Sequence, residues 1–166
     1  MSFLSSLEFP GHPLRHALLG AALLAATAIS IAAPAKVLPF GPSTWIDLQQ
    51  SGARPHAVVF STTDCSHCPA AIDRIAASLR SSRPKPRLTV VVMDGQGQDA
   101  VLLADRHYRQ ADTLYAFDGD AARLRYLVNP EWRGLTPYVV LLPAARVPQF
   151  FNGVPPEAML RRFLQP

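Results

Sequence analysis

The sequence predicts an α/β domain in which helices flank a central mixed β-sheet. Apolar runs of strand length alternate with segments whose apolar residues recur at helical spacing. The three strongest runs cover residues 56–62, 88–93 and 138–142. A closing pair of strands and a final helix complete the pattern, which indicates a sandwich around a mixed sheet rather than a helical bundle.

The N-terminal segment, residues 1–35, contains an uncharged apolar stretch over 17–35. Nineteen residues at about 1.5 Å rise span roughly 28 Å, close to the ~30 Å thickness of the hydrocarbon core of a bilayer. We expect an N-terminal hydrophobic helix that is either a cleaved signal peptide or a membrane anchor, since a small domain rarely buries a helix that is apolar on all sides. The small residues at 33–35 fit a cleavage site. Either way, residues 36–166 reach the outer side of the membrane.

The first elements of the domain over 43–166 follow from short local signals. Residues 36–42 are punctuated by proline and are predicted to be a linker. Ser43 can cap a short helix over 44–51, which Gly52 ends. The run at 56–62 is a strand because β-branched residues dominate it.

A longer helix is predicted over 66–82, because its apolar residues recur at helical spacing: Ile72, Ile75, Ala76 and Leu79. Pro69 is tolerated only in the first turn of a helix, where N–H groups have no partner. The helix must therefore begin at or just after Cys65. The next run, 88–93, is continuous enough to be a strand buried on both faces.

The remaining elements are marked by glycine and proline at their ends. The Gly-rich residues 94–98 end the preceding strand, and Asn129-Pro130 closes a helix. The expected elements are helix 99–110, strand 114–117, helix 120–128, strand 138–142, strand 147–151 and helix 156–164. The last helix places these residues inward: Met159, Leu160, Phe163 and Leu164.

Composition excludes several function classes. The chain has 166 residues, a net charge of +4 and two cysteines. Its basic residues are scattered without interleaved aromatics, so a nucleic-acid groove is not expected. Two cysteines are too few for a disulfide-rich miniprotein or an all-thiolate zinc site.

Both cysteines lie in one motif, Cys65-Ser66-His67-Cys68, between a predicted strand and a predicted helix. The thiolate is the reactive form of cysteine, and free N–H groups at a helix N-terminus stabilise such an anion. The spacing lets Cys68 reach the sulfur of Cys65. We predict that Cys65 is the exposed nucleophile and that Cys68 is the more buried thiol that resolves a mixed disulfide.

Two other roles for the cysteine pair stay open. A purely stabilising disulfide would close a four-residue loop, worth about 1.9 kcal/mol in the chain-entropy model against ~3 kcal/mol for a 15-residue loop. Alternatively, Cys65, Cys68 and His67 could hold Cu(I), which favours soft thiolates. Adjacent side chains on a helix diverge by about 100°, which makes that chelation awkward. We therefore predict no metal site, and the only expected cofactor is the redox-active disulfide.

Two neighbours are predicted to tune the pKa of the Cys65 thiol. An imidazolium at His67 would lower this pKa and make the disulfide a stronger oxidant. The carboxylate of Asp64 acts in the opposite direction, because it disfavours a second negative charge. His56, His107 and Met93 are assigned no role.

The order of strand, C-x-x-C, helix and strand, with Thr136-Pro137 before a later strand, resembles the thioredoxin fold. It is most similar to exported thioredoxin-like proteins of the TlpA-like and disulfide-exchange groups, over residues 43–166. The resemblance implies a three-layer sandwich with a cis peptide bond before Pro137, facing the cysteines. It also implies that backbone groups of Thr136 pair with a substrate like an added strand. Residues 151–153 and the final helix match the family's C-terminal glycine and helix.

The sequence departs from the family pattern at several positions. Asp64 replaces the usual Trp, and Val59 replaces the buried acid of cytosolic thioredoxins. His67 before the second cysteine resembles disulfide oxidases and isomerases. The segment 94–135 instead resembles the insertion of the TlpA-like group, which mostly reduces disulfides. The direction of electron flow therefore stays open.

These features predict an extracytoplasmic thiol–disulfide oxidoreductase that exchanges its Cys65–Cys68 disulfide with substrate proteins and with a redox partner protein. Its expected location is the periplasmic side of the bacterial inner membrane, anchored by residues 17–35 or soluble after cleavage. A monomer is expected. The alternative is a non-enzymatic assembly factor on the same fold, a Cu(I) or thiol chaperone for a respiratory or electron-transfer enzyme.

Overall fold

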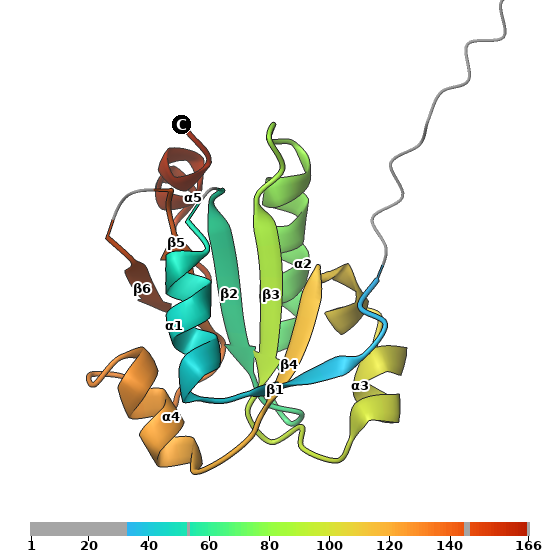
Figure 1. Cartoon of the computed structure of the whole chain (residues 1–166). Coiled ribbons are helices and arrows are strands. Elements are labelled where there is room, and N and C mark those ends of the chain that lie inside the picture. Colours follow the sequence, from blue (N-terminus) through green and yellow to red (C-terminus); the bar gives the residue numbers. More distant parts are fainter. Residues whose placement is uncertain (1–32, 53, 145–146, 166) are drawn as a thin grey trace, which may run out of the picture. The chain divides into compact units, whose positions relative to one another are not determined.

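The protein is described here by a computed structural model, which covers residues 33–52, 54–144 and 147–165. A six-stranded sheet lies at its centre, with strand order β1-β4-β3-β2-β5-β6 (Figure 1). The first four strands in this order are parallel to one another, whereas β5 is antiparallel to both β2 and β6. The strands are β1 (Val37–Phe40), β2 (His56–Ser61), β3 (Arg87–Val92), β4 (Thr113–Phe117), β5 (Tyr138–Leu142) and β6 (Gln149–Asn152).

Helices cover both faces of the sheet, which confirms the predicted three-layer α/β arrangement. One apolar core lies between the sheet and α2, α3, η1 and α5, and the second core lies between the sheet and α1 and α4. The helices are α1 (Pro42–Gln50), α2 (Cys68–Arg80), α3 (Asp99–Ala104), the 3₁₀ turn η1 (Tyr108–Gln110), α4 (Ala121–Val128) and α5 (Glu157–Leu164).

The central strand β2 shows why its sequence is a continuous apolar run. Val59 is buried in the α2-side core, and its neighbour Phe60 is buried in the α1-side core. Successive side chains of a strand point to opposite faces, so a strand covered on both faces is expected to be apolar at most positions. The same holds for β3, which is buried from Leu88 to Val92.

Residues 37–40 form an edge strand, whereas the sequence predicts a linker over 36–42. Strand β1 pairs in parallel with β4, and Phe40 is fully buried among the aromatic side chains of Phe60, Tyr115 and Phe117. Pro39 is exposed in this strand. Proline lacks an N–H donor and is therefore tolerated at a sheet edge, where one side of the strand has no neighbour.

The helix predicted over 99–110 is divided into α3 and η1. Its break lies at Asp105, whose backbone is extended. The Asp105 carboxylate accepts the backbone N–H groups of His107 (2.7 Å) and Tyr108 (3.1 Å). A side chain that satisfies the N–H groups of a new turn ends one helix and starts another, so helical periodicity alone did not show the break.

The predicted apolar helix over 17–35 lies outside the described residues, apart from residues 33–35, which are irregular. Within the described part of the chain, no helix has both the length and the apolar character that crossing a bilayer requires.

Candidate functional site

The two cysteines form a disulfide between the end of β2 and the start of α2. The Cα atoms of Cys65 and Cys68 are 5.4 Å apart. Cys65 is partly exposed, whereas Cys68 is 1% exposed. The two halves of the disulfide therefore differ in burial, with Cys65 the more exposed residue. The assignment of Cys65 as nucleophile and Cys68 as resolving thiol stays a prediction.

The predicted start of α2 was too early. The helix begins at Cys68, with Pro69 in its first turn, and Cys65 lies three residues ahead of it. Residues 62–68 instead close two successive turns, in which Cys65 N–H donates to Thr62 O (3.3 Å) and Cys68 N–H donates to Cys65 O (3.2 Å). Cys65 therefore precedes the helix N-terminus instead of lying within its first turn.

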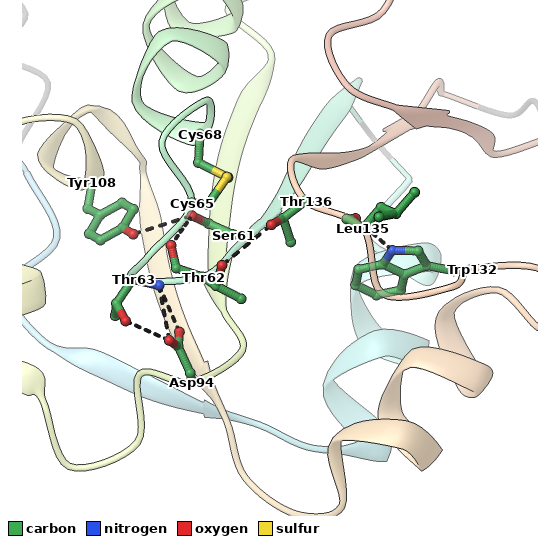
Figure 2. Close-up of a disulfide and its surroundings, with 10 residues drawn as sticks. All are labelled: Ser61, Thr62, Thr63, Cys65, Cys68, Asp94, Tyr108, Trp132, Leu135 and Thr136. Carbon is green, nitrogen blue, oxygen red and sulfur yellow. Dashed lines mark hydrogen bonds between the residues drawn. A yellow bond between two sulfur atoms is a disulfide. The ribbon is translucent and has the colours of Figure 1, made fainter.

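The loop before β5 lies next to this turn. The peptide bond between Thr136 and Pro137 is cis, as the resemblance implies. The hydroxyl oxygens of Thr62 and Thr136 are 3.4 Å apart, so the segment before Cys65 touches the proline loop (Figure 2). Gly153 N–H donates to Pro137 O (2.7 Å), and φ of Gly153 is +86°, a conformation that favours glycine.

An aromatic stack supports the proline loop from the other side. The ring of Trp132 lies parallel to that of Tyr138, with 4.3 Å between the ring centroids. The indole N–H of Trp132 donates to Leu135 O (2.9 Å), and Asn129 Nδ2 donates to the Tyr138 hydroxyl (2.7 Å). Leu135, next to Thr136, is 63% exposed. The loop is therefore held by buried rings while its apolar tip faces solvent.

A carboxylate fixes the segment between β2 and the cysteines. Asp94 follows β3 and accepts the backbone N–H of Thr63 (2.9 Å) and its hydroxyl hydrogen (2.5 Å). Figure 2 shows both bonds below the disulfide. Since β2 and β3 are parallel neighbours, their carboxyl ends meet at the same edge of the sheet. Asp94 was not predicted as a site residue, although this adjacency is the signal that could have found it.

The predicted tuning residues flank the disulfide at the surface. Asp64 and His67 are both exposed, and His67 is the residue just before α2. Their influence on Cys65 stays a prediction.

Buried polar side chains near β2 were also missed. Ser61 is fully buried, and its hydroxyl lies 3.3 Å from that of Tyr108, which η1 delivers. At the other end of the strand, His56 is 3% exposed and lies 2.7 Å from the Thr89 hydroxyl. Nothing in the local pattern distinguishes Tyr108 from an ordinary core residue.

Metal-binding groups are limited in the described ranges, where no three His, Cys, Asp or Glu side chains come together in a way that could hold a metal ion.

The sequence and the structure were compared with known proteins. No family model and no curated protein matches the sequence. Among solved structures, the thioredoxin domain of a thiol-disulfide oxidoreductase from Bacteroides vulgatus shares 10% identity at a TM-score of 0.53, covering 71% of this chain and 84% of that one. A secreted Mycobacterium tuberculosis disulfide oxidoreductase homologous to E. coli DsbE shares 15% identity at a TM-score of 0.48, covering 67% and 80%. Mycobacterium tuberculosis DsbF, in mixed oxidized and reduced forms, shares 11% at 0.49, covering 70% and 82%.

The protein has a thioredoxin-like fold. The sheet order, the C-x-x-C disulfide before α2 and the likeness to the Bacteroides vulgatus domain agree on this point.

Proposed function

We propose that this protein is a thiol–disulfide oxidoreductase that acts on proteins outside the cytoplasm. The observation that carries the proposal is the disulfide of a partly exposed Cys65 and a buried Cys68, next to the loop that contains Thr136. A stabilising disulfide has no need of an accessible sulfur. The Bacteroides vulgatus domain with the same fold is itself named a thiol-disulfide oxidoreductase.

The chemistry proceeds by two exchanges. A substrate thiolate attacks Sγ of Cys65, forms a mixed disulfide and breaks the Cys65–Cys68 bond, so that Cys68 leaves as a thiolate and takes up a proton. A second substrate thiolate then attacks the substrate sulfur and releases Cys65. Two electrons pass from two substrate thiols to the protein, and the same steps in reverse reduce a substrate disulfide.

The loop at Thr136 and Pro137 presents the substrate in this proposal. Backbone groups of Thr136 pair with an extended segment of the substrate protein, as in the addition of a strand. The exposed Leu135 lies next to this position, and Trp132 holds the loop beneath it. A rigid presenting loop places the substrate sulfur in line with Cys65.

The cellular setting is part of the proposal. The uncharged stretch over 17–35 supports export of residues 36–166, either as a signal peptide that is removed or as an anchor in the bacterial inner membrane. The domain then acts as a monomer on the periplasmic side, where disulfides persist, and a second protein restores its redox state.

The test is capture of the mixed disulfide. The reduced Cys68→Ser variant, mixed with a peptide that contains a disulfide, should accumulate a covalent adduct at Cys65 that dithiothreitol releases. Cys65→Ser should form no adduct and exchange no disulfide, while Ser78→Ala, on the outer side of α2, should behave as the unmodified protein. Exchange by Cys65→Ser would contradict the proposal. Tight Cu(I) binding by a reduced protein that exchanges nothing would favour the metal-chaperone alternative instead.

A further inference from the structure

A chain of hydroxyl groups joins η1 to the turn that contains Cys65. Ser61, the last residue of β2, is fully buried, and Tyr108 is 8% exposed. The Ser61 hydroxyl lies 3.2 Å from Thr62 O and 3.3 Å from the Tyr108 hydroxyl. Figure 2 shows this chain running from the tyrosine ring to the segment just before the cysteines.

The direction of the hydrogen bonds follows from the groups involved. A carbonyl oxygen only accepts, so Ser61 must donate its single hydroxyl hydrogen to Thr62 O. In its other contact Ser61 can then only accept, and Tyr108 is the donor. Burial raises the pKa of Tyr108, which keeps this hydrogen in place at neutral pH. The chain therefore runs from Tyr108 through Ser61 to the Thr62 carbonyl.

The Thr62 carbonyl is shared with the reactive turn. It also accepts the backbone N–H of Cys65 (3.3 Å), so both of its lone pairs are engaged. The side chain of the same residue contacts Thr136 on the cis-proline loop. Thr62 therefore lies between the cysteine turn and the loop proposed to present the substrate, and Tyr108 is the far end of the chain that fixes it.

We propose that Tyr108 is a positioning residue for disulfide exchange, acting on Cys65 through Ser61 and the Thr62 carbonyl. This proposal rests on the proposed function. A fixed turn keeps the two thiols of the reduced protein close together, which raises their effective concentration and favours the intramolecular disulfide. The segment between β3 and β4 thus does more than cover the sheet, because it supplies a residue that sets the redox equilibrium.

The measurement is the equilibrium between the full-length protein and glutathione, in which the reduced pair and one glutathione disulfide give the protein disulfide and two glutathione thiols. Tyr108→Phe removes only the donor hydroxyl. It should lower this equilibrium constant roughly threefold to tenfold, the size of one net hydrogen bond. A tenfold change corresponds to about 30 mV in reduction potential.

A second variant keeps the test valid if Tyr108→Phe folds poorly. Ser61→Ala breaks the same chain and should shift the equilibrium by a similar factor. The double variant should shift it no further, because both residues act through one carbonyl. Tyr115→Phe, which removes a half-buried hydroxyl on β4, is the matched control and should leave the equilibrium unchanged.

Three outcomes separate the two proposals. In the first outcome, the unmodified protein equilibrates with glutathione, and Tyr108→Phe and Ser61→Ala have the same equilibrium constant. This result would overturn the role of Tyr108 and leave the proposed function intact. Additive shifts in the double variant would also overturn it. Unmodified protein that does not equilibrate would contradict the proposed function itself.

Discussion

At the scale of single residues, two exposed side chains, Asp64 and His67, lie within two residues of Cys65 in the sequence. A positive charge beside a thiolate stabilises the thiolate, and a negative charge destabilises it. The interaction energy of two unit charges 4 Å apart in water is about 1 kcal/mol. We expect His67→Ala to slow alkylation of reduced Cys65 by iodoacetamide near pH 6, by roughly twofold to fivefold. Asp64→Asn should accelerate the same reaction.

Salt provides the control for this prediction. Interactions between exposed charges weaken as ionic strength rises, so both effects should shrink in 1 M salt. Effects of equal size in 1 M salt, or with the signs exchanged, would contradict electrostatic tuning by these two residues.

His56 predicts a pH dependence of folding. Burial lowers its pKa from 6.5 to about 4, and the charge of Arg87 acts in the same direction, while Asp112 opposes it. Between these two pH values the unfolded chain binds a proton that the folded chain excludes. The free energy of unfolding should therefore fall as pH drops from 6.5 towards 4, by up to roughly 3 kcal/mol from this residue.

Urea unfolding at several pH values measures this term. His56→Gln cannot titrate, so its free energy of unfolding should fall less steeply than that of the unmodified protein over the same range. Equal slopes for the unmodified protein and His56→Gln would contradict the assignment.

At the scale of elements, α4 depends on one cap. Asp120 precedes the helix, and its carboxylate accepts the backbone N–H of Arg123 (2.7 Å). Asp120→Ala should lower the free energy of unfolding by about 1 kcal/mol, because a helix N-terminus loses a partner for one of its donors. Chemical denaturation measures this. Since α4 packs on the face of the sheet away from α2, the reduction potential should stay unchanged. Asp118→Ala is the control variant. If Asp120→Ala lowers the free energy of unfolding no more than Asp118→Ala does, the capping role of Asp120 is contradicted.

An element could be predicted from the sequence where its own residues mark it, and it was missed where pairing with a distant segment or a single side-chain cap defines it. Strands β2, β3 and β5 are apolar at most positions because both faces are covered, and the sequence shows this directly. Strand β1 was not predicted, because its proline is typical of a linker and only the pairing with β4 makes this segment a strand. The break between α3 and η1 at Asp105 was not predicted, because a single side-chain cap ends the helix although the apolar pattern continues.

At the scale of the whole molecule, the site combines residues that are distant in sequence. The C-x-x-C motif and the Thr-Pro pair were predictable because motif and resemblance mark them. Tyr108, Asp94 and Trp132 join the same region only through the parallel register of β2, β3 and β4 and the stacking on Tyr138. Such contacts depend on the assembled sheet, so the sequence alone offers no reason to select Tyr108 or Trp132, whereas Asp94 follows a predicted strand and carries a local signal.

The most direct test of the account is the reduction potential of the Cys65–Cys68 pair in the unmodified protein, measured by equilibration with glutathione buffers. An exchanging disulfide should equilibrate reversibly at a potential between roughly −120 and −270 mV, the range of thioredoxin-like oxidants and reductases. A potential below about −300 mV, typical of disulfides that only stabilise a fold, would contradict the account.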